Sequence, residues 1–139
     1  MDRRKLLFFG FVLAMFMFSF LYIKNKSLFV DEQVHYLQIK RFNEGDLRIY
    51  DIITVIPGYH YSLSVFSKIF NVSSEEGIRF FNSLIGLGSI FLFLLVAYKI
   101  QNISSFRKSL EYAFFPILFP FFFLIYTDVL SLFLVLLMI

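Results

Sequence analysis

Three side chains able to carry acid-base chemistry follow the first long apolar run directly: Asp31, Glu32 and His35. Ionisable groups are costly to place at a membrane boundary, so their presence indicates function. If the segment after Val30 is helical, Asp31, His35 and Gln38 stand at i, i+4 and i+7 on one face. Such a face could hold a carboxylate base oriented by a neighbouring hydrogen-bonding group. Glu32 lies about 100° round the helix and is free for a different partner.

The same residues could instead be solvated interfacial groups at the end of a membrane span, and spacing alone does not decide between the two interpretations. A zinc metalloprotease is excluded more firmly, because its signature needs two histidines four residues apart and Asp31 occupies the first position. The chain contains no cysteine, which excludes thiolate metal sites and cysteine nucleophiles. No metal-ligand cluster is visible in the sequence, so we expect no bound metal.

Further polar residues could complete a site in this region. Lys40, Arg41 and Arg48 follow on the same loop and could attract a lipid phosphate group, or they could anchor an interfacial segment by snorkelling. Asp128 is the second acid at a membrane boundary, and it could act in catalysis or cap the next helix at its N-terminus.

The composition indicates which kind of structural element positions these residues. Hydrophobic residues make up 59% of the 139 residues and 22 are Phe, which is more apolar surface than a soluble domain of this size can bury. The Phe content is explained most simply as lipid-facing bulk. The net charge is only +3, and the Lys and Arg residues stand in short clusters between apolar runs, which indicates membrane topology rather than a nucleic-acid surface. We therefore expect an all-α, polytopic transmembrane protein.

The apolar runs predict a sequence of spans and loops. A span needs roughly 20 apolar residues to cross a hydrocarbon core of about 30 Å. A cleaved signal peptide would have a shorter apolar region ending in small residues, so we interpret the first run as an uncleaved anchor. The predicted map has spans at about 6–23, 78–98 and 110–126, a truncated span at 129–139, and an acidic loop at 24–77 with a re-entrant or interfacial helix at 58–70.

Charge bias orients this map. Lys99, Arg107 and Lys108 make the loop after the second span basic, which marks it as cytoplasmic and places the acidic loop and Asp128 together on the opposite face. Three sequons report on this topology: we expect Asn71 to be open to glycosylation and Asn102 to be closed, while Asn25 lies close to the membrane. Pro116 and Pro120 predict a kinked third span whose freed carbonyls need partners on neighbouring helices.

Ordered matches across nearly the whole chain add a family resemblance. They run Val30-Asp31-Glu32 with His35 and Gln38, Glu44-Gly45, Tyr50-Asp51, Ile53-Thr54, Pro57-Gly58, Ile78-Arg79-Phe80-Phe81-Asn82, Phe115-Pro116 and Tyr126-Thr127-Asp128. This order resembles the GT-C membrane glycosyltransferases, and among them the dolichyl-phosphate-glucose α-1,2-glucosyltransferases. Such enzymes carry ten or more spans, so the resemblance implies that residues 1–139 are the N-terminal part of a single GT-C membrane domain and are inactive alone.

The resemblance implies a reaction and a set of roles. Glucose would pass with inversion from dolichyl phosphate glucose to the dolichyl-diphosphate oligosaccharide acceptor for protein N-glycosylation, at the lumenal face of the endoplasmic reticulum membrane. Asp31 would be the catalytic base, since one carboxylate must take the proton of the attacking hydroxyl. Lys40, Arg41 and Arg48 would hold the lipid phosphate. No cofactor or metal is expected, and the implied substrate-binding residues are Glu32, His35, Gln38, Asp51 and Asp128.

Two other function classes remain open at this point. One is another GT-C transferase, such as a mannosyl- or oligosaccharyltransferase, which a screen of lipid-phosphate sugar donors would separate. The other is a small non-enzymatic membrane subunit or anchor, which a product that is stable alone would favour.

Overall fold

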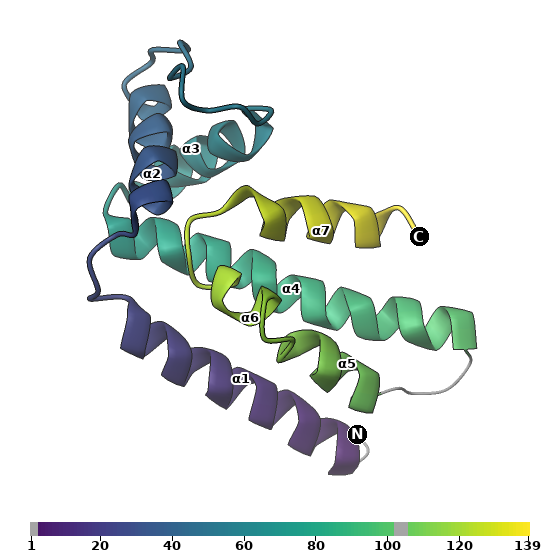
Figure 1. The fold of residues 1–139 in the computed structure, drawn as a ribbon. Helices are drawn as coiled ribbons and strands as arrows, with labels where there is room; N and C mark the ends of the chain where they lie inside the picture. Colours follow the sequence, from purple (N-terminus) through teal and green to yellow (C-terminus); the bar gives the residue numbers. More distant parts are fainter. Residues whose placement is uncertain (1–2, 102–105) are drawn as a thin grey trace.

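A computed structural model describes residues 3–101 and 106–139, and this described part of the chain is helical without strands. The sequon at Asn102 lies outside the described residues. Figure 1 shows long helices lying side by side, with a pair of shorter helices at one end. The helices are α1 (Arg3–Ile23), α2 (Val30–Asn43), α3 (Gly58–Phe70), α4 (Glu75–Gln101), α5 (Phe106–Ala113), α6 (Leu118–Phe121) and α7 (Thr127–Leu137).

Two of these helices are long and apolar enough to cross a membrane. They contain Leu6–Ile23 of α1 and Glu75–Ile100 of α4, which match the spans predicted at 6–23 and 78–98. Both are straightforward to predict, because an uncharged apolar run of this length is a local property of the sequence. The helical character is thereby confirmed, and two of the predicted spans are helices with the length and apolarity to cross a membrane.

The third predicted span is wrong as a continuous helix. Within 110–126 the chain forms the end of α5, a turn and the four residues of α6, and then an irregular segment leads to α7. The physical reason is Pro116 and Pro120, which cannot donate a backbone hydrogen bond inside a helix. Asn82 of α4 supplies the partner that the broken backbone needs, because its Nδ2 donates to the carbonyls of Phe121 and Leu124 at 3.0 and 2.6 Å.

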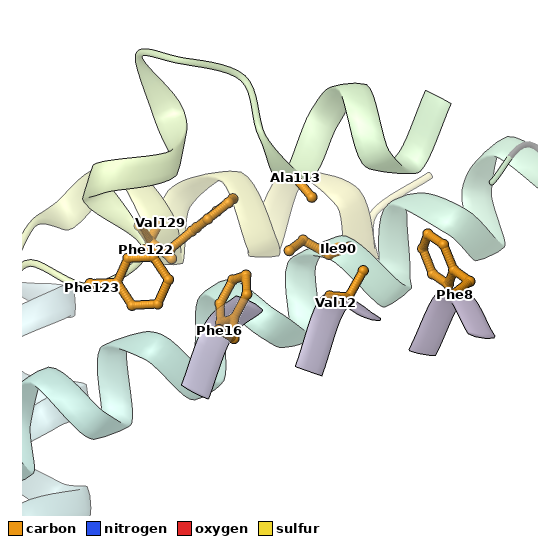
Figure 2. Packing of buried hydrophobic residues seen from close by; sticks show 8 residues of the cluster. All are labelled: Phe8, Val12, Phe16, Ile90, Ala113, Phe122, Phe123 and Val129. Atoms are coloured by element: carbon orange, nitrogen blue, oxygen red, sulfur yellow. The ribbon is translucent and has the colours of Figure 1, made fainter. Parts of the chain in front are cut away.

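One apolar core joins the long helices. Figure 2 shows Phe8, Val12 and Phe16, spaced four residues apart along one side of α1, facing Ile90 of α4 and Phe122. These phenylalanines are buried, so only part of the Phe content faces outward, as Phe11 and Phe18 do. The lipid-facing interpretation is therefore wrong for the buried side of α1, and it stays a prediction for the exposed side.

The short helices α2 and α3 pack together at one end of the long helices (Figure 1). Their shared core contains Ile39, Tyr59 and Leu63, and it extends to Ile78 of α4 and Ile125. α3 covers the residues 58–70 that were predicted to be a short re-entrant or interfacial helix, and α2 meets the condition that the segment after Val30 be helical. These two helices carry the residues of chemical interest.

Candidate active site beside the first turn of α2

A pocket opens beside the N-terminal part of α2. Its volume is about 210 Å³, and three segments far apart in the sequence form it: α2, the loop before α3, and the residue before α7. The lining residues are Asp31, Val34, His35, Ile52, Ile53, Thr54, Val55 and Tyr126. The lining combines polar and apolar side chains, which suits a ligand that carries both hydroxyl groups and hydrocarbon.

Asp31 is the carboxylate of this pocket. It is exposed and stands in the first turn of α2, where the helix dipole favours a negative charge. His35 follows one helical turn later on the same side, and its ring packs edge-on against Tyr126 with 5.6 Å between the ring centroids. A base and a hydrogen-bonding group therefore share one face of a helix, as the spacing predicted.

A second histidine, which sequence reasoning missed, completes the group. His35 Nδ1 lies 2.9 Å from Nε2 of His60, a fully buried residue of α3. His60 Nδ1 is buried and has no hydrogen-bond partner. The two residues stand 25 positions apart, so no local pattern announces their pairing.

The electrostatics of the pair oppose a positive charge. Burial lowers the pKa of His35, although the charges of Asp31 and Asp128 act in the opposite direction. Burial, followed by the neighbouring His35, lowers the pKa of His60 to about 4. Burial also raises the pKa of Tyr59, helped by the charges of Glu32 and Asp128. At neutral pH the imidazoles and the phenol of this group are thus uncharged.

Asp128 lies close enough to act on this group. It stands in the first turn of α7, but the N-cap of that helix is Tyr126 and no side chain caps it. The helix-capping interpretation of Asp128 is therefore wrong in its simple form. Asp128 is exposed, and its charge acts to raise the pKa of both His35 and Tyr59. Asp31 and Asp128 therefore both act on the pKa of His35.

Glu32 faces the opposite way, into the protein. Its carboxylate is fully buried and forms a two-point ion pair with Arg79 of α4, with both N···O distances at 2.7 Å. It also accepts hydrogen bonds from the backbone nitrogens of Phe29 and Ile125. The different partner expected for Glu32 is thus Arg79, and the carboxylate has protein contacts on both oxygens.

Arg79 uses its remaining donors on the backbone that links α1 to α2. Nη1 donates to the carbonyls of Ile23 and Lys26 at 3.0 and 2.7 Å, and Nη2 donates to Ser27 at 3.3 Å. Sequence reasoning named Arg79 only as part of the ordered family matches. In the structure this residue and Glu32 fix the first turn of α2 to α1, α4 and the segment before α7, and so set the position of Asp31.

Gln38 is buried and serves the loop that follows α2. Its Nε2 donates to the carbonyl of Arg48 at 3.1 Å, and its Oε1 accepts from the nitrogen of Tyr50 at 2.9 Å. Neither Gln38 nor Asp51 lines the pocket, and Asp51 is exposed in a turn. These contacts hold residues 48–50 in place. The chain then continues into residues 52–55, which form one wall of the pocket.

The predicted phosphate-binding cations lie beyond the pocket, at the far end of α2 and in the following loop. Lys40 is exposed, and Arg41 stacks over the ring of Tyr50 at 3.6 Å. Arg48 pairs with Asp46 at 2.8 Å, and this hydrogen-bonded guanidinium holds the pKa of Asp46 at about 2. None of the three cations therefore lines the pocket, and Asp46 neutralises Arg48 in part.

Within residues 3–101 and 106–139, no three His, Asp or Glu side chains are grouped so that they could hold a metal ion. His35 and His60 each use one ring nitrogen in the contact between them. The pocket offers an exposed carboxylate beside an imidazole whose pKa is lowered by burial.

Comparison with known proteins gives one match. The family model described as the DIE2/ALG10 family matches residues 25–139. No curated protein and no solved structure matches the chain. The matched region contains every residue that lines the pocket, together with both members of the Glu32–Arg79 ion pair.

Proposed function

The chain belongs to the DIE2/ALG10 family, and from this membership we propose that it acts in transferring glucose from dolichyl phosphate glucose to the terminal glucose of the lipid-linked oligosaccharide, forming an α-1,2 linkage. The family implies a glucosyltransferase of N-glycan precursor assembly. Donor and linkage follow from the ordered resemblance of the sequence. The observation that carries the site assignment is the exposed Asp31 carboxylate beside His35 in a pocket of mixed polarity.

The proposed step is a single inverting displacement. The acceptor hydroxyl oxygen forms a bond to the anomeric carbon while the bond from that carbon to the donor phosphate oxygen breaks. Asp31 takes the hydroxyl proton, as one carboxylate does in inverting transfer. Dolichyl phosphate leaves as a stable anion, so the leaving group needs no general acid.

Other residues support this step in two ways. His35 and Asp128, which act on the pocket from α2 and α7, are proposed to bind acceptor hydroxyls. Glu32 and Gln38 are proposed to support the substrate site without touching the substrate. Their contacts fix the first turn of α2 and the loop at residues 48–50. Asp51 is proposed to meet the acceptor at the exposed edge of that loop.

Lys40, Arg41 and Arg48 are proposed to hold the donor phosphate. A doubly accepting phosphate group would compete with Asp46 for Arg41 and Arg48, which now lie 3.6 and 2.8 Å from that carboxylate. The remaining features of the proposal are a GT-C fold, metal-independent catalysis, and a multi-pass position in the endoplasmic reticulum membrane with the pocket on the lumenal side.

Replacing the proposed base tests the assignment. Asp31→Asn keeps the shape of the side chain and removes its basicity, so glucose transfer should fall about 10²–10⁴-fold. The assay uses membranes from cells that express the complete open reading frame and lack any endogenous enzyme, with labelled dolichyl phosphate glucose as donor. Glu75→Gln is the matched control, because it changes an exposed acid in the first turn of α4, outside the pocket.

The outcomes separate function from residue role. Absence of glucose transfer by the wild type, with transfer from another lipid-phosphate sugar, would overturn the proposed donor. Transfer by Asp31→Asn at the level of Glu75→Gln, with equal amounts of protein in the membrane, would remove Asp31 as the base.

A further inference from the structure

The contact between His35 and His60 fixes where the protons of the pair lie. The two facing nitrogens are 2.9 Å apart, so one of them carries the shared proton and the other accepts it. The opposite nitrogen of His60, Nδ1, is buried without a partner. Two proton arrangements are therefore available to the neutral pair, and they differ in whether the buried Nδ1 of His60 carries a proton.

In the first arrangement His60 Nε2 donates to His35 Nδ1, and His60 Nδ1 is left as an unpaired acceptor. In the second, His35 Nδ1 donates to His60 Nε2, and His60 must carry its own proton on the buried Nδ1. Buried N–H groups without a partner are rarer and more costly than unsatisfied acceptors. The first arrangement is favoured, and it places the proton of His35 on Nε2.

We propose that His60 is a positioning residue that holds His35 in the Nε2–H form, so that His35 presents a hydrogen-bond donor to the ligand of the pocket lined by Asp31. His35 lines this pocket, and its Nδ1 is already engaged, so Nε2 is the ring nitrogen left for a ligand. That the ligand is a sugar rests on the proposed function, whereas the proton arrangement does not.

A fixed donor beside a carboxylate has a defined chemical preference. A sugar hydroxyl donates one hydrogen bond and accepts others, so it can donate to Asp31 and accept from Nε2–H of His35 at the same time. The same proton arrangement also opposes charging of His35. Protonation at Nδ1 would force His60 to accept, and the buried Nδ1 of His60 would then carry an unpaired N–H.

All groups that face His35 affect whether its imidazole becomes charged. Asp31 lies on the same helix, His60 and Tyr59 lie on α3, and Tyr126 and Asp128 come from the start of α7. The two carboxylates favour a charged imidazole, and burial disfavours it. The proton arrangement shared with His60 disfavours it as well. Removing the restraint from His60 should therefore let the carboxylates raise the pKa of His35.

The chain suits a direct test, because His35 and His60 are its only histidines. Protein labelled with ¹⁵N-histidine, in lipid nanodiscs, gives two imidazole spin systems whose nitrogen shifts report the tautomer. Single variants at either position assign them. At pH 7 the wild type should show His35 as the Nε2–H tautomer and both rings neutral. Observation of His35 as the Nδ1–H tautomer in the wild type would overturn the proposal without any variant.

His60→Gln adds a test of the mechanism. Gln lacks the rigid ring that links the nitrogen facing His35 to a second nitrogen at the buried position. Its amide oxygen can therefore accept from a protonated Nδ1 of His35 while the flexible side chain adjusts, and the titration of His35 should move upward. Ser64→Ala is the control, because it breaks the hydrogen bond from Ser64 to Asn43 between the same two helices and does not touch the histidines. A His35 tautomer and titration unchanged in His60→Gln, or changed equally in Ser64→Ala, would contradict the positioning role.

Discussion

Adjacent acids in the first turn of α2 have opposite surroundings. Asp31 is exposed in the pocket, whereas Glu32 is fully buried against Arg79. The rotation of about 100° between neighbouring helical residues is enough to send one carboxylate to solvent and the other into the core. One residue is thereby free for chemistry, and the other anchors the turn that presents it.

Glu32→Gln should destabilise the protein strongly. The substitution leaves the Arg79 guanidinium buried without a counter-charge, and removing one partner of a buried ion pair typically costs about 3–5 kcal/mol. The midpoint of thermal unfolding in nanodiscs measures the loss. The matched control is Glu111→Gln, because the Arg107–Glu111 pair is exposed at both ends and such pairs contribute roughly 0–1 kcal/mol. Equal shifts of the midpoint for the two variants would contradict the anchoring role of Glu32.

At the scale of the elements, α4 supports the irregular segment that replaces the third predicted span. Gly86 lies directly beneath Phe122, and a Cβ atom at this position would come within 2.8 Å of the Phe122 ring and 2.9 Å of its Cβ. The absence of a side chain at Gly86 therefore allows the segment after α6 to approach the helix. Asn82, one turn earlier on α4, binds the carbonyls of the same segment.

Gly86→Ala should lower the stability, by about 1–3 kcal/mol as typical overpacking does. In an exposed helix the same change would stabilise by roughly 0.5–1 kcal/mol, because Gly is the poorer helix former. Gly10→Ala in α1 is the control, since nothing lies within 4 Å of its added Cβ. Thermal unfolding midpoints that move in the same direction for both variants would show that the close approach at Gly86 is not tight.

The elements also show which features the sequence could predict. The two long spans and α3 were predictable, because membrane-length apolar runs and the Pro57-Gly58 start are local signals. The break in the third predicted span was underestimated, because the hydrogen bonds that Asn82 donates to the carbonyls of Phe121 and Leu124 come from another helix and follow no local pattern.

Within the site, the shared face of Asp31 and His35 was predictable from helical spacing. The roles of Arg79 and His60 were not, because their partners lie 47 and 25 residues away along the chain. Gln38 was predicted on the same face as Asp31 and His35, but it is buried outside the pocket, and its hydrogen bonds go to a loop whose path no periodicity describes.

For the whole molecule, the arrangement places the pocket and Lys99 at opposite ends. α2 and α3 lie at one end of the long helices, beside the start of α4 (Figure 1), and Lys99 stands in the last turn of α4. If α1 and α4 both cross the membrane, the pocket and Lys99 lie on opposite sides of the bilayer.

Single cysteines should report this separation. The chain contains no cysteine, so Glu44→Cys and Lys99→Cys can be made without any other change. In sealed microsomes a membrane-impermeant maleimide should label Lys99→Cys, while Glu44→Cys should react only after the membrane is opened. Glycosylation at Asn71, the exposed C-cap of α3, should agree with Glu44. Labelling of both cysteines from one side would contradict the map.

The hydrogen bond from Ile125 to Glu32 also sets an order of events during synthesis. It joins residues 93 positions apart, and at about 5–20 residues per second a ribosome needs roughly 5–20 s to make that stretch. Arg79, the partner of Glu32, is synthesised about halfway through this interval. Tyr126, which lines the pocket, is synthesised only at its end. The pocket is thus complete only after Tyr126 has been made, well after its carboxylate.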